Sequence, residues 1–140
     1  VFLHLIAREG LEDRFVVDSA GTGGWHVGNP ADRRMRAAAE RRGIHLPSRA
    51  RQIELADFSA FDRILTMDDD NLRNVRSLAR ELGDRPGLAR IEPMTSHCRR
   101  LSASEVPDPY YGGEQGFEQV LDLLEDACAG LLESLLREQR

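Results

Sequence analysis

The sequence predicts an α/β fold in which helices cover both faces of a parallel sheet. Three short apolar runs, at residues 14–21, 61–68 and 89–94, have the length and composition of buried strands. Helical patterns lie between them, and strands that alternate with helices generally pair in parallel. With 41% apolar and 31% charged residues, residues 1–140 are expected to form a single domain.

The first two helices are predicted from their apolar spacing and their end signals. Residues 1–8 carry apolar side chains at helical spacing and Gly10 follows as a stop signal, but no Ser, Thr, Asp or Asn caps their beginning. Residues 30–43 begin with a proline, contain strong helix formers and close on Gly43. The connection at residues 45–58 is expected to hold at most one short helical turn.

Two more helices are predicted in the second half of the chain. The aspartates at residues 68–70 begin a helix that runs to about Leu82, because negative charge is favourable at a helix N-terminus. Residues 116–139 form a long C-terminal helix with one apolar face. The predicted order therefore begins with a helix and lacks an opening strand.

The functional site is expected outside the carboxyl ends of the strands, where ligands of such folds bind. The loops that follow the predicted strands are residues 18–28, residues 67–71 and the segment after residue 94. Side chains that carry the chemistry should therefore come from these three loops.

The last of these loops contains the sequence VPDPYYGG, in which Asp108 stands between two prolines. Pro107 and Pro109 fix the backbone on both sides of the carboxylate. A general acid needs such placement, because proton transfer requires hydrogen-bond reach. Tyr110 and Tyr111 would then flank an aromatic substrate. The same residues also fit an ordinary surface turn, since Asp-Pro and Gly-Gly are turn dipeptides.

Trp25, the only tryptophan, lies in the glycine-rich loop after the first predicted strand. It is either an anchor that pins the loop to the core or one wall of a site that receives an aromatic ring. The loop lacks the dinucleotide-binding glycine pattern, and Ser19 and His26 lack the sequence context of a serine hydrolase. The four histidines have no metal-ligand spacing, so no metal site is expected.

Four segments in this order and spacing, DSAGTGGWHVGNPAD, RARQI, FDRILTMDDDNL and VPDPYYGG, resemble the low-molecular-weight protein tyrosine phosphatases over nearly the whole chain. The resemblance implies a small α/β fold with a four-stranded parallel sheet. It also implies hydrolysis of phosphotyrosine through a cysteinyl-phosphate intermediate, without a metal or another cofactor. The expected partners are a phosphotyrosine-containing protein as substrate and phosphate or a similar oxyanion as ligand.

The resemblance also implies roles for individual residues. Asp108 corresponds to the general acid, which later acts as base for the hydrolytic water. Tyr110 and Tyr111 resemble tyrosines that line the pocket, and Trp25 resembles the aromatic residue of the facing loop. Ser19 corresponds to a hydroxyl that supports the phosphate loop.

Two further positions match or depart from the pattern of the family. Asp68 resembles a structural acid that follows a strand. Ser48 departs from the pattern, because many relatives carry a histidine at that place, and this departure affects one supporting hydrogen bond.

The nucleophile of the family, in a C-x-x-x-x-x-R-[ST] loop, has no match in this sequence. Ser104 and Ser134 stand where an arginine would have to follow Cys98 and Cys128. Cys98 is expected to be a loop thiol and Cys128 a buried helix residue. We therefore expect the nucleophile, the phosphate-binding arginine and a central strand to lie upstream of Val1, so that the sequence is incomplete at its N-terminus.

Composition excludes several other classes of function. The net charge of -5 disfavours nucleic acid as a partner, and no apolar run approaches the ~20 residues of a membrane span. Two distant cysteines without a C-x-x-C pair are typical of a cytoplasmic protein.

Three alternative functions stay open. The first is a catalytically inactive binding module of the same fold. The second is an arsenate reductase, for which the two cysteines lack the close spacing, and the third is hydrolysis of arginine phosphate.

Overall fold

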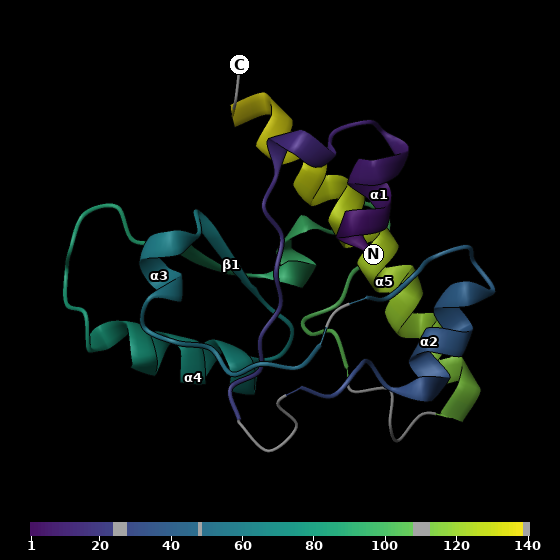
Figure 1. Ribbon diagram of the computed structural model, residues 1–140, viewed down its shortest axis with the longest axis horizontal. Coiled ribbons are helices and arrows are strands. Elements are labelled where there is room, and N and C mark those ends of the chain that lie inside the picture. The colour runs from purple at the N-terminus through teal and green to yellow at the C-terminus, as the bar shows by residue number, and fades with distance from the viewer. Residues whose placement is uncertain (24–27, 48, 108–112, 139–140) are drawn as a thin grey trace.

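The computed structural model describes residues 1–23, 28–47, 49–107 and 113–138, with only the backbone at 113 and 114 (Figure 1). Two of the three predicted strands are confirmed, and they pair in parallel, with Arg63 opposite Arg90 and Thr66 opposite Pro93. The elements are α1 (Phe2–Arg8), η1 (Glu12–Arg14), α2 (Arg33–Glu40), α3 (Asp57–Ala60), β1 (Arg63–Thr66), α4 (Asp69–Arg80), β2 (Arg90–Pro93), η2 (Met94–His97) and α5 (Gly113–Glu138), where η marks a 3-10 helix.

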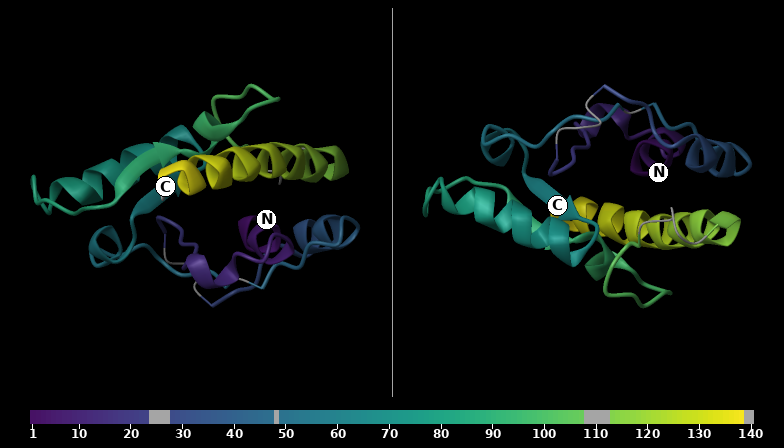
Figure 2. Two further views of the ribbon diagram at one scale, coloured as in Figure 1. Left: turned by 90° about the horizontal axis from the view of Figure 1, so that it is seen from above. Right: turned by 90° about the horizontal axis from the view of Figure 1, so that it is seen from below.

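The helices lie in two layers on either side of β1. Figure 2 shows α4 and α5 in one layer and α1, α2 and α3 in the other. This arrangement confirms the α/β class with a parallel sheet. No helix in the described part of the chain is long and apolar enough to cross a membrane.

The predicted strand at residues 14–21 is not one of the named strands. Arg14 ends the short helix η1, Phe15 has an extended backbone, and residues 16–20 have no regular secondary structure. The Val16 side chain is 85% exposed, and Gly21 makes only an isolated bridge with Gln52. The four-stranded sheet is therefore not confirmed, since the described residues form a sheet of two strands. An extended apolar segment becomes a strand only where a neighbour offers free backbone groups.

The helix boundaries follow the end signals in the sequence. The Asp32 carboxylate accepts hydrogen bonds from the backbone N–H groups of Arg34 and Met35, which caps α2. Gly43 follows α2 with φ +76°, a conformation that favours glycine. Asp68 caps α4 by accepting from the backbone N–H of Asn71 at 2.7 Å. The acidic run at the start of α4 therefore has the structural role that the sequence predicts.

The long helix α5 organises the core. One face packs against η2 and β1 through Ala127, Cys128 and Leu131, and another face packs against α2 through Phe117 and Leu121. At Gly130 the backbone of α5 passes so close to η2 that a β-carbon would overlap the backbone oxygen of His97. The core therefore joins both layers through a single helix.

Candidate active site

The segment that leads to Asp108 is held at the carboxyl end of β1. The backbone N–H of Val106, which is buried, donates to the carbonyl oxygen of Met67 at 2.6 Å. A carboxylate oxygen of Glu105 accepts from the backbone N–H of Asp69 at 3.1 Å. The loops after β1 and β2 therefore meet beyond the sheet, as the sequence predicts for a ligand site.

The start of the loop that follows η2 is anchored to α5. The Asp126 carboxylate accepts from the backbone N–H groups of Arg99, Arg100 and Leu101, at 3.1, 3.0 and 2.8 Å from one of its oxygens. Burial by itself would raise the pKa of Asp126, but these three donors outweigh it, and the pKa lies below its ordinary value. A charged carboxylate thus fixes the start of the loop at neutral pH.

Four of the predicted site residues lie outside the described residues: Asp108, Tyr110, Tyr111 and Trp25. Ser48, the predicted departure, lies outside them as well. Ser19 is described and exposed, and its backbone N–H donates to a carboxylate oxygen of Asp18 at 2.7 Å. The predicted roles of these residues therefore remain predictions.

The glycine-rich loop is closed at its base by the RARQI segment. Gly21 exchanges two backbone hydrogen bonds with this segment, donating to Arg51 at 2.8 Å and accepting from Ile53 at 2.9 Å. On the other side, the Gly28 N–H donates to the Ala50 carbonyl at 2.6 Å. One short stretch of backbone thus holds both ends of the segment that contains Trp25.

Arg51 joins this loop base to α3, a contact that the sequence does not predict. Its guanidinium donates to both carboxylate oxygens of Asp57, at 2.9 and 3.1 Å, and to Asp18 at 3.1 Å. The hydrogen bond from Arg51 holds the pKa of Asp57 below its ordinary value. Asp18, Arg51 and Asp57 belong to different segments of the chain, so no periodic signal indicates their contact.

The two cysteines have the positions that the sequence predicts. Cys98 lies in the loop after η2 and is half-buried, whereas Cys128 lies on α5 and is 3% exposed. Burial raises the pKa of the Cys98 thiol, and the nearby Asp126 carboxylate raises it further. Burial raises the pKa of Cys128 to about 11. Because the reactive species is the thiolate, neither cysteine is suited to nucleophilic attack at neutral pH. The described residues also hold no group of three metal-ligating side chains.

Comparison with known proteins decides the family. The family model described as low molecular weight phosphotyrosine protein phosphatase matches residues 1–140. The chain belongs to this family of enzymes. A curated relative from Synechocystis, named as a putative low molecular weight protein-tyrosine-phosphatase, is 46% identical over 133 residues, which cover 95% of this chain and 83% of the relative.

Solved structures of phosphatases also match the fold over nearly the whole chain. The crystal structure of a protein tyrosine phosphatase from Entamoeba histolytica has a TM-score of 0.89 and 37% identity, and the match covers 99% of this chain and 86% of that one. A Drosophila arginine phosphatase has a TM-score of 0.86 and 29% identity over 96% of this chain and 85% of the other. The matching solved structures therefore include one enzyme named as a tyrosine phosphatase and one named as an arginine phosphatase.

Proposed function

We propose that the protein hydrolyses phosphotyrosine in protein substrates, with Asp108 as general acid and base. The observation that carries the proposal is the hydrogen bond from Val106 to Met67, which holds Val106, two residues before Asp108 in the sequence, at the carboxyl end of β1 in a chain of the phosphatase family. The loop that supplies the general acid thus begins where the fold presents its ligands.

The proposed reaction has two steps. A cysteine thiolate attacks phosphorus, the bond from phosphorus to the tyrosine oxygen breaks, and Asp108 gives its proton to that oxygen. Water then attacks the cysteinyl phosphate, and Asp108 takes its proton as phosphate leaves and the thiolate is restored. The Asp108 carboxyl is therefore protonated at the start of the cycle and again at its end.

The nucleophile in this proposal comes from a C-x-x-x-x-x-R-[ST] segment upstream of Val1. The raised pKa values of Cys98 and Cys128 support this, since both thiols stay protonated at neutral pH. Backbone N–H groups and the arginine of that segment would bind the phosphate. The Thr66 hydroxyl at the end of β1 is buried and has no hydrogen-bond partner among the described residues, and such a loop would supply one.

The proposed substrate preference comes from aromatic side chains. Trp25 on one loop and Tyr110 and Tyr111 on the other would form a slot deep enough for phosphotyrosine and too deep for phosphoserine. Ser19 would support the phosphate loop through its hydroxyl. Because a thiolate nucleophile needs reducing conditions, we propose that the enzyme acts in the cytoplasm.

Replacing Asp108 by Asn tests the role of the general acid. Asp108→Asn should lower turnover about 10²–10⁴-fold on substrates with poor leaving groups, such as phosphotyrosine, because Asn has no acidic proton to give. The loss should be much smaller on p-nitrophenyl phosphate, whose leaving group needs no proton. Steady-state kinetics on both substrates measure the two losses. The control is Asp84→Asn, at an exposed position. An equal loss of activity of Asp108→Asn on both substrates would contradict the proposal.

Arginine phosphate is a second candidate substrate, because the structural match to the Drosophila arginine phosphatase is nearly as close as that to the tyrosine phosphatase. A comparison of kcat/KM on matched phosphotyrosine and phosphoarginine peptides would decide between them. A slot lined by Trp25 and the two tyrosines should favour the aromatic substrate, and a preference for phosphoarginine would assign the second function instead.

A further inference from the structure

We infer that the groove between the loop after η2 and helix α5 binds a short peptide segment of a partner protein, in which one acidic side chain stands beside one large aliphatic side chain. One wall of this η2–α5 groove is residues 99–101, and the other is the stretch of α5 from Asp122 to Ala129. All of these residues are described by the structure, and none of them takes part in the proposed hydrolysis. The groove would therefore be a second site, which goes beyond the proposed function.

The size of the groove fits about three residues of an extended peptide. Its helical wall, from Asp122 to Ala129, is about 10 Å long at 1.5 Å per residue of helix. An extended chain rises about 3.3 Å per residue. The volume of about 440 Å³ lies in the range of cavities that hold small ligands. The occupant is therefore a short segment with two or three side chains in the groove, and not a helix or a domain.

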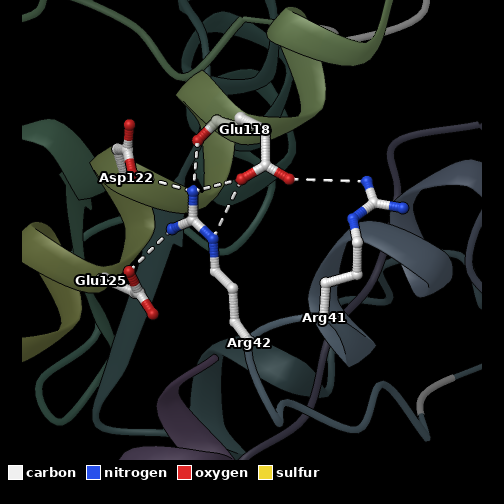
Figure 3. A network of polar contacts seen from close by, with 5 residues as sticks. All are labelled: Arg41, Arg42, Glu118, Asp122 and Glu125. Carbon is white, nitrogen blue, oxygen red and sulfur yellow. Dashed lines mark hydrogen bonds and ion pairs between the residues drawn. The ribbon is translucent and has the colours of Figure 1, made fainter.

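The carboxylates of the groove already have partners within the protein. Arg42 binds Asp122 at 2.9 Å and Glu125 at 2.8 Å (Figure 3). The Asp126 carboxylate accepts from the backbone N–H groups of residues 99–101. Because these N–H groups are occupied, the loop wall cannot bind a peptide backbone through them. Recognition at this wall therefore depends on side chains.

The loop wall offers one cation without a partner and one exposed leucine. Arg99 forms an ion pair with Glu133, whereas the Arg100 guanidinium makes no hydrogen bond or ion pair with another described residue. Leu101, the next residue, is 43% exposed. A guanidinium binds a carboxylate through two parallel hydrogen bonds, and an exposed leucine is stabilised by contact with another apolar side chain. The wall thus complements a carboxylate and an aliphatic side chain that are adjacent in a peptide.

The helical wall limits the occupant to few acidic side chains. Asp122 and Glu125 are bound by Arg42, but their side chains are still 57% and 46% exposed. A second acidic residue in the occupant would meet this negative charge, and like charges at close range repel. The groove should therefore prefer a mixed acidic and aliphatic segment to a run of acidic residues. This preference separates the groove from a general attraction of anions to exposed arginines.

The test measures binding of the fluorescein-labelled peptide GSELSG to the full-length protein by fluorescence polarisation. Arg100→Met should raise the dissociation constant about 3- to 10-fold, the effect of one partly exposed charged pair. Leu101→Ser should raise it by a similar factor through the lost apolar contact. The matched control is Arg76→Met, which removes an exposed arginine of α4 that also has no partner among the described residues. This control should leave the dissociation constant unchanged.

Two further peptides check the chemistry of recognition. GSQLSG lacks the carboxylate, so it should bind more weakly than GSELSG to the unmodified protein and should lose little more in Arg100→Met. GEEEEG carries four carboxylates and no aliphatic side chain, and it should bind more weakly than GSELSG. In amide spectra of the protein, GSELSG should shift the signals of residues 99–101 and Ala129 and leave the signal of Arg76 unchanged.

No binding of GSELSG at millimolar concentration would overturn the inference. Tighter binding of GEEEEG, an equal loss in Arg76→Met, or shifts confined to residues outside the groove would overturn it as well. Arg100 and Leu101 are exposed, so neither substitution should unfold the protein, and circular dichroism of each variant checks this. None of these measurements depends on catalysis, so a failure of the proposed function would leave the test of the groove intact.

Discussion

At the scale of single residues, position 130 has space for a glycine and for no larger residue. It lies in the interior of α5, where glycine is normally unfavourable by about 1 kcal/mol relative to alanine. The close backbone of His97 explains its presence, because a β-carbon would overlap the carbonyl oxygen. Tertiary contact thus outweighs helix propensity at this position.

Gly130→Ala should therefore destabilise the protein by about 1–3 kcal/mol, the usual cost of overpacking, although alanine is the better helix former. Urea unfolding followed by circular dichroism at 222 nm measures the change. Gln119→Ala, on an exposed position of the same helix, should leave the midpoint nearly unchanged. A more stable Gly130→Ala protein would mean that α5 and η2 separate at little cost.

Residues whose role depends on local sequence could be predicted, and those whose role depends on distant partners could not. The cap at Asp68 and the burial of Cys128 follow from helical spacing, and the structure confirms both. The contact of Arg51 with Asp18 joins residues 33 positions apart, so only the folded chain brings them together. The proposed acid and aromatic residues were found through their motifs and remain predictions.

At the scale of elements, the end of α2 is fastened to α5 by a cluster of charges (Figure 3). The Arg42 guanidinium, in a side chain 22% exposed, contacts Glu118, Asp122 and Glu125, which lie on successive turns of one face of α5. Arg41, 60% exposed, makes one ion pair with Glu118 at 3.6 Å. Neighbouring arginines thus differ sharply in the number of carboxylates that they neutralise.

Arg42→Met should lower the free energy of unfolding by about 1–2 kcal/mol, because three carboxylates on one helix face would lose their shared cation. Arg41→Met removes one exposed pair and should cost about 0–1 kcal/mol. Urea titrations of both variants at low and high salt measure the difference, which should shrink with salt as screening weakens the repulsion. Equal midpoints for the two variants would show that the cluster does not fasten α2.

Elements were predicted correctly where a single segment carries its own signal. Helices α2 and α4 have a cap at one end and a glycine after the other, and the structure places them close to the predicted ranges. The run at residues 14–21 has an equally good strand pattern, but a strand also needs a partner. Apolar alternation shows what a segment can bury and does not show what lies beside it.

At the scale of the whole molecule, the buried thiol of Cys128 links stability to alkaline pH. Its pKa is raised from 9.0 to about 11 by burial, so the folded state keeps the proton that the unfolded chain loses. The stabilisation is complete below pH 9 and is lost as pH rises towards 11. Residues 1–140 contain no lysine, so none of them adds a lysine titration to this range.

The free energy of unfolding should therefore fall by on the order of 2 kcal/mol between pH 9 and pH 11 through this group. Guanidinium unfolding at several pH values measures the slope. Cys128→Ala should be less stable at every pH, because it leaves a cavity, but should show a shallower decline. An unchanged slope in the variant would assign the decline to other groups, such as the two tyrosines.

The backbone contacts of Gly21 and Gly28 with residues 50–53 have a consequence for how the sequence between these glycines can vary. Gly21 and Gly28 are held by backbone hydrogen bonds, which do not depend on the side chains between them. Of these two glycines, only Gly28 carries a conformational restriction, with φ +89°. The side chains between Gly21 and Gly28 can therefore be exchanged, by evolution or in a designed library, without loss of the backbone hydrogen bonds that hold these two glycines.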